Sequence, residues 1–148
     1  MEGDPRRGRL LIGEVHDNYA AALGGAAGHA GLFGTAAGVG AFARGLLEAS
    51  RSGAPSVREM TTKSSVPGSS RALGWDTMLP TSSCGTRMSA SAFGHVGYTG
   101  TSLWIDLDRA MHVIVLSNRV HPTRDNDKIR EFRPLIHDLI VRAATASS

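Results

Sequence analysis

The sequence predicts an α+β fold, in which an antiparallel sheet of three main strands is flanked by helices and followed by a terminal helix. Residues 103–107 alternate leucine or isoleucine with tryptophan and aspartate, which is the pattern of a half-buried strand. A hairpin turn at 106–109 leads into another apolar strand, so this pair is antiparallel. Apolar residues recur at helical spacing on either side of the strands, which predicts the flanking helices.

Composition places the chain among folded globular proteins with one core. Its 148 residues include 41% hydrophobic and 20% charged side chains, whereas a disordered chain would be poorer in the first and richer in the second. The pI of about 9.6 invites a nucleic-acid interpretation, but the 16 basic side chains are scattered among 13 acidic ones. We therefore expect no nucleic-acid partner.

The N-terminal part begins with an irregular arm and continues with a glycine-rich stretch. Residues 1–16 have no regular pattern, and their apolar run of three residues is far too short for a signal sequence or a membrane span. Residues 17–38 contain six glycines among alanines, which suits a short helix and a tight loop. We expect no membrane span in this chain.

Two helices are predicted between residues 35 and 62. Thr35 is a suitable N-cap for the first helix, and Gly53 ends it. Ser56 and Glu59 have the spacing of a capping box for a second, short helix that extends to about Thr62. The apolar positions of the first helix are Val39, Phe42, Ala43, Leu46 and Leu47.

The strands lie in the second half of the chain. A polar linker, residues 63–71, precedes a short strand at 72–79. The three main strands follow at 93–100, 101–108 and 111–118. Both faces of the last one are apolar, so we expect it to be central in the sheet.

A terminal helix is predicted from residue 126 onward, because one helical face is apolar there. Pro134 lies inside the pattern and predicts a kink or the first turn of the main helix body. The predicted apolar face consists of Ile129, Phe132, Leu135, Ile136, Leu139, Ile140 and Ala143.

Several signatures of catalysis and metal binding are missing. There is no Gly-x-Ser-x-Gly elbow, no His-Glu-x-x-His, no phosphate-binding loop and no dinucleotide fingerprint. Of the six histidines, His16 and His29, with Asp17, come nearest to a metal site, but no spacing matches a known ligand pattern. The single cysteine, Cys84, excludes an internal disulfide and has no neighbouring histidine. We predict neither a metal nor another cofactor.

Four motifs in a fixed order carry a resemblance to a known family. They are GEVHDNYAAALGGAAGHAGLFGTAAGVGAFARGLL, then LGWDT, then FGHVGYTGTSLWIDLDRAMHVIVLSNRVHPTRDN, then the amphipathic terminal helix. Together they closely resemble the C-terminal part of serine β-lactamase-like hydrolases, which include class C β-lactamases, D-alanyl-D-alanine peptidases and related esterases. The resemblance extends from about Arg9 to Ala144.

The resemblance implies roles for five consecutive residues. Such enzymes use a Ser-x-x-Lys nucleophile, a Tyr-x-Asn or Ser-x-Asn base motif, and a Lys/His-Thr/Ser-Gly strand. His95-Val96-Gly97 falls at the strand motif, so His95 is implied to be catalytic, and the backbone N–H of Tyr98 corresponds to an oxyanion-hole donor. Val96, Gly97 and Thr99 are implied to bind substrate, although Val96 lacks the hydroxyl that the family has there.

The other two motifs are absent from this sequence. Met60 and Asp125 stand three residues before Lys63 and Lys128, so Ser-x-x-Lys does not occur. No tyrosine or serine is followed two positions later by asparagine. The nucleophile is therefore not in this chain, and we predict that the isolated chain has no acyl-transfer activity.

The resemblance also implies what this chain pairs with. The family fold has a five-stranded antiparallel sheet whose first two strands and nucleophile come from the N-terminal portion. We therefore expect residues 1–148 to be a single partial domain that pairs with that portion and can self-associate through an open edge. A β-lactam, a D-alanyl peptide or a carboxylic ester is the implied substrate, and family members are often extracytoplasmic. A non-catalytic binding or assembly module is the alternative.

Overall fold

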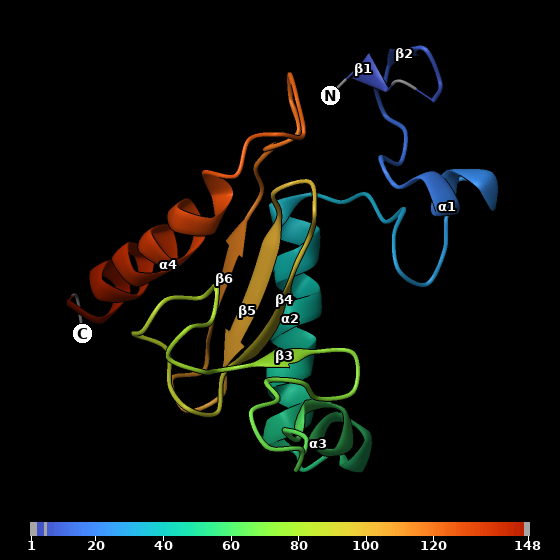
Figure 1. The fold of residues 1–148 in the computed structure, drawn as a ribbon. Helices are drawn as coiled ribbons and strands as arrows, with labels where there is room; N and C mark the ends of the chain where they lie inside the picture. The colour runs from blue at the N-terminus through green and yellow to red at the C-terminus, as the bar shows by residue number, and fades with distance from the viewer. Residues whose placement is uncertain (1–2, 5, 147–148) are drawn as a thin grey trace.

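The computed structural model describes residues 3–4 and 6–146 and contains a four-stranded antiparallel sheet. The strand order is β3-β4-β5-β6, so each strand pairs with its neighbour in the sequence (Figure 1). The predicted α+β class with an antiparallel sheet is confirmed. The strands are β3 (Asp76–Thr77), β4 (Phe93–Val96), β5 (Ser102–Asp106) and β6 (Met111–Val115).

Helices cover both faces of this sheet. Those in the described residues are α1 (Asn18–Ala22), α2 (Ala36–Arg51), α3 (Pro55–Thr61) and α4 (Ile129–Ala146). Helix α2 packs against Phe93 and Ile105, and α4 packs against Trp104 and Val113 (Figure 1). Trp104 and Ile105 are consecutive in β5, so their side chains point to opposite faces. None of these helices is long and apolar enough to cross a membrane.

Strand β5 is buried on both faces, although the alternation in residues 103–107 predicted a half-buried strand. Trp104, Ile105 and Asp106 are each 0% exposed. The indole of Trp104 lies directly on Gly94 of β4, where a Cβ atom would collide with the ring. The prediction was wrong because α4, which the local pattern does not include, covers the second face.

The first predicted helix is confirmed, and the second only in part. Thr35 Oγ1 accepts a hydrogen bond of 3.1 Å from a backbone N–H three residues later, and Gly53, at φ +74°, follows the end of α2. Helix α3 begins at Pro55 and has no side-chain cap. The predicted capping box of Ser56 and Glu59 is wrong because Pro55 starts the helix, which places Ser56 inside the first turn.

Strand β6 lies at an edge of the sheet, whereas the apolar residues 111–118 predicted a central strand. It pairs with β5 from Ser102↔Val115 to Asp106↔Met111, and no other strand in the described part of the chain pairs with it. An apolar strand with an unpaired edge can accept another strand.

Helix α4 forms where it was predicted, but only part of the predicted apolar face is buried. Ile129 is buried and Ile140 packs against the core, whereas Phe132, Leu135 and Leu139 are 43%, 60% and 44% exposed. Arg133 and His137 are buried as well. The apolar pattern missed these two polar side chains, because their hydrogen-bond partners lie in the β4–β5 turn and on β5. Pro134 lies within the helix.

The N-terminal arm contains a short hairpin, so the prediction of an irregular arm over 1–16 is wrong for part of its length. Residues 1, 2 and 5 of this range lie outside the described residues. Arg7 Nε donates to Asp4 Oδ2 (2.7 Å) across the hairpin, and Arg7 Nη2 donates to the carbonyl of His16 (3.0 Å). The paired strands are β1 (Gly3–Asp4) and β2 (Arg9–Leu10).

Candidate active site

The residues that the sequence assigns to the site are contiguous at one end of the sheet. His95 and Val96 end β4, and Gly97, Tyr98 and Thr99 begin the β4–β5 turn. The His95 side chain is exposed, and its Nδ1 lies 3.0 Å from the carbonyl oxygen of Val96. The strand and turn therefore place these residues where a ligand could reach them.

Backbone hydrogen bonds close the β4–β5 turn. The N–H of Gly97 donates to the carbonyl of Thr101 (2.8 Å), and the N–H of Gly100 donates to the carbonyl of Gly97 (3.1 Å). Gly100 has a φ of +119°, and a Cβ atom there would lie 2.9 Å from the backbone nitrogen of Arg119. Since L side chains rarely adopt this φ, glycine allows the turn to approach the segment after β6.

The Tyr98 ring contacts two residues that are distant in sequence. His16 stacks on it with a centroid separation of 5.7 Å and an interplanar angle of 25°. The Cζ atom of Arg119 lies 4.1 Å from the ring centroid, within the range of a cation–π contact. Sequence reasoning missed both partners, because no local pattern joins the arm, the turn and the segment after β6.

His16, Asp17 and His29 do not form the metal site that was considered. His29 Nε2 lies 2.9 Å from Asp17 Oδ1, whereas His16 stacks on Tyr98. Asp17 Oδ1 also accepts a hydrogen bond of 2.8 Å from the N–H of Ala20, so this carboxylate is the N-cap of α1. In the described residues, no three His, Cys, Asp or Glu side chains are grouped so that they could hold a metal ion.

One buried pair has the composition of a nucleophile and its base but lies beyond the reach of a substrate. Ser102 Oγ is 2.9 Å from His137 Nε2, and the two residues are 4% and 0% exposed. Burial, together with the nearby charge of Arg133, lowers the pKa of His137 to about 4. The pair therefore joins β5 to α4 as a structural hydrogen bond.

Cys84 is also unsuited to catalysis. It is fully buried, and burial raises the pKa of its thiol to about 12. Because the thiolate is the reactive form, this side chain is inert at neutral pH.

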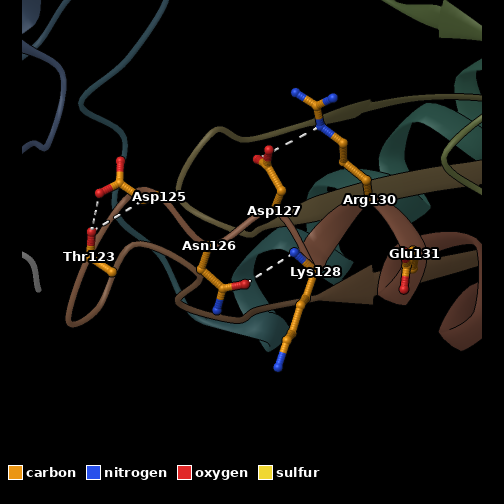
Figure 2. A pocket seen from close by; sticks show the side chains of 7 residues that line it. All are labelled: Thr123, Asp125, Asn126, Asp127, Lys128, Arg130 and Glu131. Atoms are coloured by element: carbon orange, nitrogen blue, oxygen red, sulfur yellow. Dashed lines mark hydrogen bonds and ion pairs between the residues drawn. The ribbon is translucent and has the colours of Figure 1, made fainter.

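A polar pocket lies beside the site, in the segment that leads into α4. Figure 2 shows that Thr123 points toward Asp125 and that Asp127 points toward Arg130. None of the residues from His95 to Thr99 lines this pocket. Arg119 connects the two places, because its guanidinium donates both to the carbonyl of Tyr98 and to the carbonyl of Asn126.

The α+β class with an antiparallel sheet is consistent with the class of proteins that the sequence resembles, the serine β-lactamase-like hydrolases. The family described as Beta-lactamase matches residues 1–137. The chain therefore belongs to the β-lactamase family. No solved structure gives a significant match.

The curated relatives are much longer than this chain. A protein of Escherichia coli K12 named "Putative D-alanyl-D-alanine carboxypeptidase" is 36% identical in an alignment of length 135 that covers 82% of this chain and 30% of that protein. A protein of Salmonella agona with the same name is 31% identical in an alignment of length 134 that covers 83% of this chain and 31% of that protein. The chain thus spans less than a third of the length of these relatives.

Proposed function

We propose that this chain is the C-terminal part of a serine hydrolase that forms an acyl-enzyme with an amide or ester substrate. The observation that carries the proposal is the exposed turn after His95-Val96-Gly97, in a chain that belongs to the β-lactamase family. In this reaction a serine Oγ adds to the substrate carbonyl, and its proton passes to the leaving amine or alcohol. Water then hydrolyses the acyl-enzyme and regenerates the serine.

Each residue of the turn has a role in this proposal. The backbone N–H of Tyr98 donates to the oxyanion that develops on the substrate carbonyl. Gly97 allows the substrate to lie close to β4, and His95 is a catalytic residue on the same strand. Val96 and Thr99 contact the substrate on either side of these groups.

The class of substrate follows from the relatives only as a starting point. Their printed names refer to D-alanyl-D-alanine carboxypeptidases, so a peptide that ends in D-alanyl-D-alanine is the first substrate to test. β-Lactams and carboxylic esters require the same acyl-transfer groups and are the next two.

The nucleophile must come from an N-terminal portion of the same fold, because Ser-x-x-Lys and Tyr-x-Asn are absent here. Two features of the described residues suit such a partner. They are the unpaired edge of β6 and the exposed apolar side chains of α4.

Labelling with a fluorescent penicillin tests the proposal. The isolated chain should remain unlabelled, whereas the reassembled protein, in which this chain is combined with an N-terminal portion that carries Ser-x-x-Lys, should be labelled at one serine. Sedimentation should show that the isolated chain self-associates and that the added portion abolishes this. A monomer that melts sharply and whose melting and sedimentation do not change when the N-terminal portion is added would contradict the proposal. It would favour a self-sufficient, non-catalytic binding module.

Val96→Thr tests the substrate contact at that position. The substitution restores a hydroxyl beside the oxyanion site, and one regained hydrogen bond should raise kcat/KM about tenfold for substrates with a carboxylate. Val96→Ala is the matched control because it shortens the side chain without adding a hydroxyl. An unchanged or lower kcat/KM in Val96→Thr would mean that Val96 suits an apolar substrate.

A further inference from the structure

We infer that Arg133 is a positioning residue of the proposed acyl-transfer site. From helix α4 it binds the carbonyl of Gly97 and thereby orients the N–H of Tyr98. The inference rests on the proposed function for its catalytic meaning. The geometry that carries it belongs to this chain alone.

Arg133 is a buried cation without an acidic partner. It is 9% exposed, and no carboxylate of the described residues lies within ion-pair distance of it. Its Nη2 donates to the carbonyl of Gly97 and to the carbonyl of Thr101 (3.2 Å), while its Nε has no partner among the described residues. Burying an arginine side chain costs free energy, and its hydrogen bonds to the turn offset part of this cost.

The contact with Gly97, together with the hydrogen bond that the same carbonyl accepts from the Gly100 N–H (3.1 Å), fixes the direction of the neighbouring N–H. The carbonyl of Gly97 and the N–H of Tyr98 belong to one planar, trans peptide group, in which they point in opposite directions. Since Arg133 holds the carbonyl toward α4, the N–H of Tyr98 points away from α4. No acceptor for this N–H is found among the described residues.

The other carbonyls of the turn accept hydrogen bonds from the segment after β6. Arg119 Nε donates to the carbonyl of Tyr98 (2.8 Å), and the backbone N–H of Arg119 donates to that of Thr99 (2.9 Å). Ser117 Oγ donates to the carbonyl of Gly100 (2.6 Å). Every carbonyl from Gly97 to Thr101 therefore has a donor, which leaves the turn little freedom to rotate its peptide groups.

A cation on the carbonyl also strengthens the donor at the other end of the peptide group. Hydrogen bonds in a chain polarise one another, so a guanidinium bound to the Gly97 carbonyl makes the Tyr98 N–H a better donor to an oxyanion. Neutral packing at position 133 would fill space but would supply neither the polarisation nor the second hydrogen bond.

The chain alone allows a direct structural test. In Arg133→Met, backbone order parameters from 15N relaxation at residues 97–101 should fall from about 0.85 toward about 0.6, because the carbonyls of Gly97 and Thr101 lose the guanidinium and each keeps only a backbone donor. Arg130→Met is the matched control on the same helix, since the Arg130 side chain is 80% exposed and forms an ion pair of 3.9 Å with Asp127. An unchanged turn in Arg133→Met would overturn the inference, whether or not the protein is an enzyme.

The reassembled protein gives the catalytic test. Arg133→Met should lower kcat by about 10- to 100-fold with KM nearly unchanged, because the oxyanion donor is misplaced by a fraction of an ångström. The affinity for a boronic acid, which forms a tetrahedral adduct with the serine, should fall by a similar factor. Arg133→Lys keeps the charge and should recover part of both, and Arg130→Met should change neither.

The outcomes separate the two proposals. An unlabelled wild-type protein would refute the acyl-transfer function, and the order parameters would still decide the role of Arg133 in the turn. A labelled, active protein in which folded Arg133→Met keeps its kcat and its boronate affinity would leave the function standing and overturn the inference.

Discussion

The two faces of the sheet differ in what they bury. The α2 face is an apolar core, in which Ala43 and Leu47 pack on Phe93 and Ile105. The α4 face mixes apolar residues with buried polar groups. Among the described residues, the three buried side-chain atoms without a hydrogen-bond partner, on Trp104, Arg133 and His137, all belong to this face.

The two faces contribute differently to stability and to the orientation of the turn. An apolar face contributes stability without regard to exact placement, because hydrophobic burial is non-directional. A face of hydrogen-bonded polar groups costs stability unless each group is satisfied, but it can hold a turn in one orientation. The α4 face is the one that reaches the turn from Gly97 to Thr101.

The largest effect is expected for Phe93→Ala on the α2 face. Phe93 is 1% exposed and meets Trp75 edge to face at 5.1 Å, so its removal should lower the free energy of unfolding by about 3–5 kcal/mol. Urea unfolding of the 148-residue chain measures this. Phe132→Ala on α4 is the matched control and should cost less than about 1 kcal/mol there, because Phe132 is 43% exposed.

The same control sharpens the proposed pairing. If an N-terminal portion covers the exposed side of α4, Phe132→Ala should become clearly more destabilising in the reassembled protein. Equal, small losses in both forms would argue against that cover.

A smaller effect is expected for Asp106→Asn. Asp106 is 0% exposed, and its carboxylate accepts hydrogen bonds from the N–H of Ser89 (2.9 Å) and from Arg109 Nη1 (2.8 Å). Losing hydrogen bonds to a charged group should lower the free energy of unfolding by about 1.5–3 kcal/mol at pH 7. Chemical unfolding measures the loss, and Asp108→Asn, at a neighbouring turn position, should have little effect.

The acid dependence gives Asp106 a second signature. Burial acts to raise its pKa, but hydrogen bonds from Ser89 and Arg109 outweigh burial and hold the pKa below its usual value. The unfolded chain therefore takes up protons first, and stability falls as the pH drops below about 4. Asp106→Asn should flatten this part of the pH profile.

A comparable but separate pH window is expected for His137. Burial is the main cause that lowers its pKa to about 4, against about 6.5 in an unfolded chain. The unfolded state therefore binds a proton that the folded state does not, and stability should fall between about pH 6.5 and 4, by about 3 kcal/mol. His137→Gln should remove this slope, and a slope that persists in this variant would assign it to other groups.

The smallest effect is expected at the start of α2. Thr35→Ala removes the cap hydrogen bond of 3.1 Å and should cost about 1 kcal/mol in thermal or urea unfolding. Ser56→Ala is the control, because Ser56 makes no cap in the structure and should change stability by only a few tenths of a kcal/mol. Equal losses would restore the capping box that the structure contradicts.

Much of the fold could be predicted because its signals are local. The cap at Thr35, the helical repeat of α2 and the hairpin between β5 and β6 each depend on residues within a few positions of one another. The five residues from His95 to Thr99 could also be singled out, since they form one continuous motif. Their catalytic roles remain predictions.

The errors have a common physical cause. The burial of β5 and of α4 depends on what lies across the sheet, and the place of β6 depends on which strands lie beside it. Apolar periodicity describes one element at a time. It cannot predict that an arginine is buried because it donates to two carbonyl oxygens of another segment.

Contiguous residues were sufficient to predict the family, the α+β class and the order of the main strands, and to show that Ser-x-x-Lys does not occur. The folded structure was needed to show that Arg133 and Arg119 hold the carbonyls of the β4–β5 turn and that His16 stacks on Tyr98. These contacts join segments that are far apart in the chain, and hydrogen bonds form according to distance and direction in space rather than position in sequence.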